Sequence, residues 1–147
     1  MADEKSGLDV AMDALEGEIK LLGESAELLC KRHLDFVMAQ NKSRDWGSKS
    51  TLFAQTRMRG YGLTANWYEV RWYGSKITNT RRMTKRLIVR PKVGYSYTAA
   101  TLAKQSQPWE LDMVREVETE MVEIRRRAFF IAKALSSLNH LDRKKSK

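Results

Sequence analysis

Basic side chains are concentrated in the middle third of this chain. Residues 41–106 hold fourteen Lys and Arg but only two acidic residues, Asp45 and Glu69, a local charge of +12. By contrast, residues 1–40 carry a charge of −5 and residues 107–147 a charge of +2. Guanidinium and ammonium groups bind phosphate oxygens, and a local excess of positive charge indicates a polyanionic partner. The chemistry that these residues predict is phosphate binding.

Aromatic side chains are interleaved with the basic ones. The same third of the chain contains Trp46, Trp67, Trp72 and several tyrosines. Flat rings can stack on bases, whereas a membrane-binding surface would place basic and apolar residues on opposite faces of a helix. Nucleic acid is therefore the predicted partner, and no membrane contact is expected. The predicted DNA-binding residues are Arg57, Arg59, Arg71, Lys76, Arg81, Arg82, Lys85, Arg86 and Arg90.

Residues 76–86 form a dense part of this basic region. They carry five positive charges, and the hydroxyl groups of Thr78, Thr80 and Thr84 could add hydrogen bonds to phosphate. Part of the segment is predicted to be a loop, which could reach into a groove. The alternative is a solvated strand face whose arginines only keep the protein soluble, although ordinary surfaces mix both signs of charge.

Residues that could support catalysis are sparse. His33 and His140 lie far apart, on or near apolar helical patterns, which is typical of core or helix-end histidines. Glu116, Glu120 and Glu123 have spacings that could gather a metal ion, but ion pairing with nearby basic residues on a helix surface explains them better. The chain has no GxxxxGK phosphate-binding loop. We therefore predict no enzymatic activity, no metal and no cofactor.

Two amphipathic helices are predicted to flank the basic region. Apolar residues recur in steps of three and four over Leu8–Phe36, and Ser6 is placed to cap the start. The same periodicity runs over Val114–Leu138, after a helix start at Gln107–Glu110 that contains a proline. Each pattern produces a narrow apolar stripe that another element must cover.

Three short β-type runs lie between the helices. The predicted strands are Thr51–Arg59, Ala65–Tyr73 and Arg82–Val89. Their spacing and the turn residues between them predict an antiparallel meander. Because successive side chains of a strand alternate between faces, Tyr68, Val70 and Trp72 share one face and Trp67 lies on the other. We expect the face of Tyr68, Val70 and Trp72 to contact the core.

The predicted fold is α+β, with a long N-terminal helix, a three-stranded antiparallel meander and a long C-terminal helix. The helices pair with each other against one sheet face and leave the other face free. A second arrangement would pair one helix with its copy in a homodimer whose sheets face two DNA half-sites. The chain is predicted to be a single domain over residues 1–147, with tails at residues 1–6 and 142–147.

Cysteine usage and hydropathy predict a cytoplasmic protein. Cys30 is the single cysteine, so no internal disulfide can form. No stretch approaches the roughly 20 apolar residues of a membrane span. The N-terminus is acidic at Asp3 and Glu4, unlike the basic start of a signal peptide.

Spaced aromatic and basic residues give the chain a resemblance to a known family. The residues that carry it are Trp67–Gly74, Thr80–Arg82, Tyr95–Tyr97, Gln107–Glu110 and Glu123–Arg127. Over about Leu63–Leu138 the chain resembles the MobI-type accessory proteins of conjugative transfer, which integrative conjugative elements and related plasmids carry. The resemblance implies a role beside the relaxase at the origin of transfer, recognising or remodelling that DNA before nicking, without chemistry of its own.

The sequence thus predicts a non-catalytic factor that binds double-stranded DNA, with a relaxase or other transfer proteins as further partners. Two alternatives remain open. One is an adaptor whose paired helices dock on a partner protein. The other is an RNA-binding module in which Tyr68, Tyr73 or Tyr95 stacks on unpaired bases. Exposed aromatic rings would favour RNA, and buried ones would favour duplex DNA.

Overall fold

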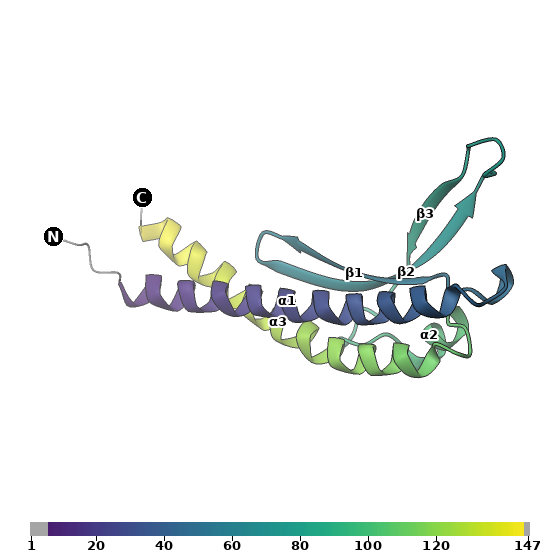
Figure 1. Cartoon of the computed structure of the whole chain (residues 1–147). Helices are drawn as coiled ribbons and strands as arrows, with labels where there is room; N and C mark the ends of the chain where they lie inside the picture. The colour runs from purple at the N-terminus through teal and green to yellow at the C-terminus, as the bar shows by residue number, and fades with distance from the viewer. Residues whose placement is uncertain (1–5, 146–147) are drawn as a thin grey trace.

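The computed structural model describes residues 6–145, and side chains through Asp142. It is an α+β fold in which two long helices lie side by side under a small sheet (Figure 1). The elements in chain order are α1 (Gly7–Asn41), a 3-10 turn η1 (Trp46–Ser48), β1 (Leu52–Arg59), β2 (Gly62–Tyr73), β3 (Arg82–Leu87), α2 (Ala99–Gln105) and α3 (Leu111–Lys145).

Both long helices form where the apolar periodicity predicts them. The Ser6 hydroxyl accepts a hydrogen bond from the Asp9 amide at 3.2 Å, and this bond caps the start of α1 as expected. Ile19, Ala26 and His33 of the predicted stripe are buried. On α3 the buried positions again follow the stripe, as Val114, Val117, Met121, Ala128 and Leu135.

The structure contains more helix than was predicted, in two places. The short helix α2 was not predicted, although Thr98 caps it by accepting a hydrogen bond from the Thr101 amide at 3.2 Å. At the other end, α3 continues through Lys145, so residues 142–145 are helical where a tail was predicted. Residues 1–5 and 146–147, the rest of the predicted tails, lie outside the described residues.

The sheet is an antiparallel meander in the order β1-β2-β3, as predicted. Strand β2 pairs with β1 through its first part, from Gly62 to Glu69, and with β3 through its second part, from Tyr68 to Tyr73. The two pairings overlap only at Tyr68 and Glu69. The sheet is therefore two hairpins that share one long strand, and only the first hairpin lies along the helices (Figure 1).

The core lies between the helices and one face of the first hairpin. Ala65 and Trp67 of β2 face the helices and are buried, and Trp67 is only 1% exposed. The predicted inner face of β2 was therefore wrong, because Trp72 is 49% exposed and Tyr68 and Val70 are only partly buried. The prediction treated β2 as having a single inner face along its length, whereas its second half rises away from the helices and its last three residues, Arg71–Tyr73, are exposed.

A buried ion pair on α3 holds the first hairpin in place. Glu118 and Arg125 are each 6% exposed and form a bidentate pair with both N···O distances at 2.8 Å. Glu118 also accepts hydrogen bonds from the Trp67 indole at 2.9 Å and the Tyr97 amide at 2.8 Å. Arg125 also donates to the Ala65 carbonyl at 2.8 Å. Glu118 is not one of the apolar residues of the predicted stripe, but it is part of the core.

His33 is a core residue, as its position on the apolar stripe predicts. Its ring is 1% exposed and contacts Trp67 edge to face, with 5.0 Å between ring centroids. Its Nε2 lies 3.4 Å from the buried Glu110 carboxylate. Glu110 in turn accepts a hydrogen bond from the Gln107 amide at 3.0 Å, just before α3. The histidine therefore links α1 to the start of α3.

Candidate nucleic-acid interface

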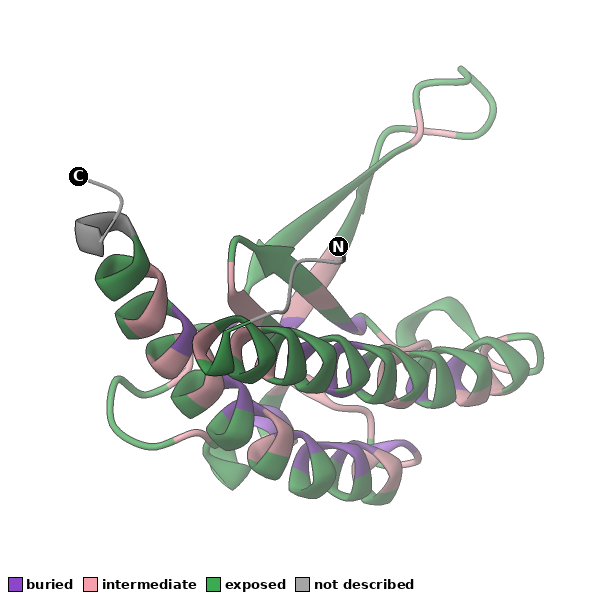
Figure 2. Cartoon of the chain, turned by 90° about the vertical axis from the view of Figure 1, so that its left-hand side faces the viewer, coloured by how far each residue is buried: buried purple, intermediate pink, exposed green. Residues whose placement is uncertain are grey.

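The second hairpin projects from the body of the protein. We call residues 71–87 the arm; they comprise the end of β2, the connecting loop and β3. In Figure 1 the arm rises away from the helices, and in Figure 2 it is exposed over its length. Every residue of the arm is exposed except Ser75 and Arg81, which are half-buried. The six-residue ladder between β2 and β3 begins just before the arm, at Tyr68, and spans about 20 Å at 3.4 Å per residue.

Local hydrogen bonds define the loop at the tip of the arm. The Ser75 amide donates to the Thr80 hydroxyl at 3.2 Å, and the Thr78 and Thr80 hydroxyls lie 2.7 Å apart. Gly74 has a φ of +78°, which favours glycine, and a Cβ there would come within 2.2 Å of the Thr80 carbonyl oxygen. Two hydroxyls that were expected to bind phosphate therefore hydrogen-bond within the loop itself.

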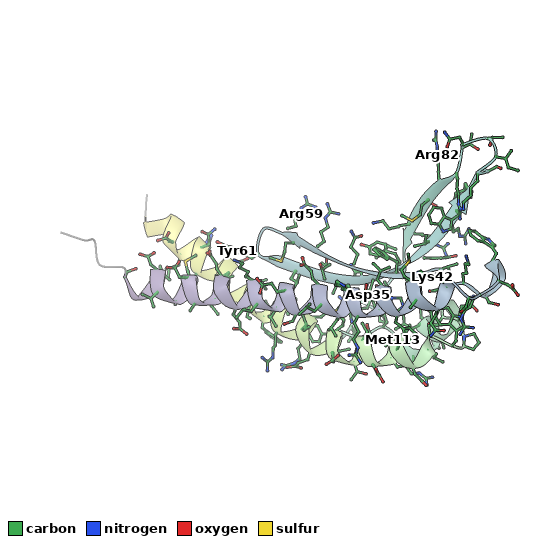
Figure 3. All side chains as sticks on the ribbon, viewed as in Figure 1. Asp35, Lys42, Arg59, Tyr61, Arg82 and Met113 are labelled. Carbon is green, nitrogen blue, oxygen red and sulfur yellow. The ribbon has the colours of Figure 1, made fainter. Side chains whose placement is uncertain are left out.

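Three of the nine predicted cations lie on the sheet face that points away from the helices. The strand register places Arg57 and Arg59 of β1 and Lys85 of β3 on this face. Lys85 is held there, because its Nζ donates to the Gln55 side chain at 2.8 Å and lies 5.4 Å from the Phe53 ring centroid. In Figure 3 the labelled Arg59 and Arg82 both lie on the side of the molecule opposite the helices.

Two further cations on the other face of the arm are bound to a single acid. The Arg71 Nε donates to one oxygen of Glu69 at 3.0 Å, and Arg86 donates to the other at 2.6 Å. The hydrogen bond from Arg71, followed by the influence of Arg86, lowers the pKa of Glu69 below its usual value. Glu69 therefore neutralises part of the positive charge at the base of the arm and orders both guanidinium groups.

The remaining predicted residues fall into three positions. Lys76 and Arg82 are exposed on the arm and form no ion pair with any residue in the described range 6–145. Arg81 stacks on aromatic rings, as described next. Arg90 lies after β3, outside the arm, where its guanidinium donates to the Gly94 carbonyl at 2.9 Å. The structure thus gathers six of the nine predicted residues on the arm, whereas Arg57 and Arg59 lie near the turn of the first hairpin and Arg90 lies after β3.

Arg81 lies between two indole rings. Its guanidinium carbon is 4.8 Å from the ring centroid of Trp46 and 4.6 Å from that of Trp72. Trp46 belongs to η1 in the loop after α1, so this contact joins that loop to the arm. Lys49 of the same loop lies 5.5 Å from the Trp46 ring. The sequence prediction included Trp46 among the aromatic residues of the basic region, but did not place it or Lys49 in the DNA-binding set.

A groove runs between the arm and the segment from the end of α1 to β1. It has a volume of about 540 Å³. One side is lined by Met38 of α1 and by Lys42, the C-cap residue of that helix. The other side is lined by Trp72 and Arg81 of the arm. Figure 3 shows the labelled Lys42 near the base of the arm. The sequence held one sign of this groove. Trp46 is a tryptophan within the polar run of residues 41–50, where no helix or strand was expected to bury it.

The fold and this surface define a protein with a helical platform and a projecting basic β arm. The chain belongs to the MobI protein family, because the family model matches residues 22–139, from α1 to near the end of α3. Membership implies an accessory role in the mobilisation of conjugative DNA. No curated protein and no solved structure matches the chain.

Two further properties concern the described residues alone. Over residues 6–145, no group of three or more His, Cys, Asp and Glu side chains is arranged to hold a metal ion. None of the helices there carries an apolar stretch that would reach across a bilayer.

Proposed function

We propose that this chain is a non-catalytic accessory factor that binds duplex DNA at the origin of transfer and places its arm in the major groove. The observation that carries the proposal is the arm itself, a two-stranded ribbon that leaves the core and presents cations on both faces. The MobI family membership supports the setting, because it implies an accessory role in mobilisation.

The dimensions of the arm suit a groove. The major groove of B-DNA is about 12 Å wide and admits a two-stranded ribbon, whose strands lie about 4.8 Å apart. The roughly 20 Å length of the ladder exceeds the groove depth of about 8.5 Å, so the arm could lie along the groove while the helices stay outside the duplex. Lys76 and Arg82 would then lie near the phosphates that border the groove.

Charge supports the same orientation. Within the described residues, Lys76 and Arg82 have no acidic partner, so no ion pair would have to break before they contact phosphate. Arg71 and Arg86 are already bound to Glu69. We therefore assign the largest phosphate contribution to the unpaired cations of the arm, with Arg57 and Arg59 extending the contact along the first hairpin.

The test is the salt dependence of binding to duplex DNA from the neighbourhood of the origin of transfer. Each phosphate contact contributes about 0.9 to the slope of log K against log salt, so Lys76→Ala with Arg82→Ala should reduce the slope by about 1.8. The advantage of the unsubstituted protein over the variant should then shrink about twelvefold between 50 and 200 mM salt. An unchanged slope would remove the arm from the interface.

A matched control removes the same charges from the helices. Lys20 of α1 and Arg115 of α3 are both exposed and, like Lys76 and Arg82, form no ion pair within the described residues, so Lys20→Ala with Arg115→Ala also removes one unpaired lysine and one unpaired arginine. We expect this variant to keep the slope of the unsubstituted protein. An equal fall in both variants would show that net charge, and not the arm, governs binding.

A second candidate function rests on the outward side of α1. Val10, Leu21 and Leu28 are more than half exposed, although they lie on a helix whose opposite side packs on the core. An adaptor that docks on a relaxase or another transfer protein would use such residues. Loss of relaxase co-purification in a Leu21→Lys, Leu28→Lys variant, with DNA binding intact, would support this function. Sedimentation of the chain alone would test the predicted homodimer.

A further inference from the structure

We infer that the groove beside the arm binds a single unpaired nucleotide, with its base against an indole ring and its phosphate on the basic side chains that line the groove. This inference rests on the proposed function and extends it from the duplex to a base that has left the stack. The ligand we infer for the groove is a nucleic acid, and the experiments below would show if it is an acidic peptide instead.

The groove has the size and lining of a ligand site. Its volume of about 540 Å³ falls within the roughly 300–1,000 Å³ of small-molecule pockets. Met38, Trp46 and Trp72 supply apolar and aromatic surface, and Lys42, Lys49 and Arg81 supply positive charge. A planar apolar ring joined to an anion matches this combination, and a nucleotide has that chemistry.

The two indole rings of the groove are held in position but remain exposed to solvent. Trp46 is 61% exposed and Trp72 is 49% exposed, yet both are held by the intervening Arg81 guanidinium. Large exposed indole rings have no packing role in the core, which is built around Trp67 instead. Preordered rings lose little conformational freedom on binding, so they suit stacking on a base.

The charge in the groove is available to a phosphate. Lys42 and Lys49 form no ion pair within residues 6–145, and Glu69, the one acid that lines the groove, is occupied by Arg71 and Arg86. A phosphate in the groove would therefore not have to compete with an acidic side chain for Lys42 and Lys49. This favours an anionic ligand over a neutral aromatic one.

The position of the groove explains why the nucleotide must be unpaired. Bases inside a duplex are stacked on their neighbours and cannot present a ring face to an indole. With the arm in the major groove, a base extruded from the adjoining step would lie beside the arm, where Trp46 is. The protein should then prefer a duplex with an unpaired base, the kind of distortion expected where a strand is opened before nicking.

The experiment compares a fully paired duplex with the same duplex carrying one unpaired thymidine, using fluorescence anisotropy at fixed salt. We expect the protein to bind the second duplex more tightly. Stacking on one base predicts that Trp46→Ala loses between about fivefold and about 150-fold of that preference, while the salt slope for the paired duplex stays unchanged because no charge is removed. Trp46→Phe should retain most of the preference, because it keeps an aromatic ring.

The matched control is Phe130→Ala, which removes an aromatic ring that is 52% exposed on α3, away from the arm. This variant should bind both duplexes as the unsubstituted protein does. Circular dichroism of all variants establishes that they are folded. Equal affinity of the unsubstituted protein for the two duplexes, or a preference that Trp46→Ala leaves intact, would overturn the inference.

Two further outcomes separate this inference from the proposed function. Binding of the paired duplex without any preference would overturn the nucleotide site and leave duplex recognition standing. Quenching of indole fluorescence by short oligothymidine without any duplex binding would overturn duplex recognition and leave the site standing. Displacement of oligothymidine by polyglutamate at equal charge concentration would show a groove for acidic peptides and overturn the assignment to a nucleotide.

Discussion

Replacing Glu118 by alanine should destabilise the protein more than any other single removal of a carboxylate on α3. The substitution leaves Arg125 buried without its bidentate partner and takes the acceptor away from the Trp67 indole and the Tyr97 amide. Breaking a buried ion pair by removing one partner costs about 3–5 kcal/mol. In a chain of this length each kcal/mol lowers the melting temperature by about 2–4 °C, so we expect a fall of about 6–20 °C.

The assay is thermal unfolding followed by far-ultraviolet circular dichroism, which reports the helices. Glu123→Ala is the matched control, because Glu123 is on the same helix and also pairs with arginines, Arg126 and Arg127, but in water. Exposed ion pairs contribute little to stability, so the control should unfold close to the unsubstituted protein. Equal unfolding midpoints for the Glu118 and Glu123 variants would refute the reasoning.

A double substitution separates the buried charge from the packing. Glu118→Gln with Arg125→Met removes both charges and keeps side chains of similar volume. Replacement of a buried pair by uncharged residues is often neutral, so this variant should recover much of the stability that Glu118→Ala loses. A double variant as unstable as the single one would show that the hydrogen bonds to β2 and to the segment before α2, and not the unpaired charge, dominate the loss.

Three other predictions concern the thiol, the base of the arm and its tip. Burial raises the pKa of the Cys30 thiol to about 11. Iodoacetamide alkylation should therefore be slow at pH 8, should become faster as the pH is raised toward 11, and should be faster at pH 8 when the protein is unfolded in urea. Because the pKa of Glu69 is lowered from 4.5 in the folded state, its stabilisation should be complete above pH 4.5 and fall at lower pH, and Glu69→Gln should abolish that part of the pH dependence in urea titrations. Gly74→Ala forces a β-carbon against Thr80 and should speed tryptic cleavage of the arm, whereas Gly47→Ala, with open space around it, should not.

The helices could be predicted because their signal repeats over many turns. The positions Val114, Met121 and Ala128 recur at heptad spacing, and a pattern of that length fits only one periodicity. The short helix α2 carries no such pattern. The opposite charges at Glu118 and Arg125, also seven residues apart and therefore on one face of the helix, were the signal for the buried pair. No buried pair was predicted there, because charged residues are rarely buried.

The strands were located, but the faces of β2 were not. Ala65 and Trp67 contact the core, and Trp72 does not, because the strand passes from one hairpin to another between them. Alternation along a strand predicts which residues share a face, but not where the strand rises away from the helices that support it. That limit depends on the three-dimensional course of α1 and α3, and no local pattern in β2 reports it.

At the candidate site, too, the residue types could be predicted from the sequence, but their pairing in three dimensions could not. Composition alone predicted Lys76 and Arg82, which the structure leaves unpaired among the described residues. It could not predict that Glu69 would bind Arg71 and Arg86 from two different strands. The pairing depends on the cross-strand register, which brings Glu69 opposite Arg86.

That one acid makes the charge of the arm asymmetric. If all the cations of the arm were unpaired, their mutual repulsion would oppose a ribbon that has no core to stabilise it. Glu69 relieves this repulsion at the base, where the strands must stay paired, and leaves the charge near the tip free for a ligand. Net charge is therefore a poor guide to the contact surface of this protein. The positions that should govern binding are those at which the fold provides no acid, and these lie at Lys76 and Arg82 and along the groove beside Trp46.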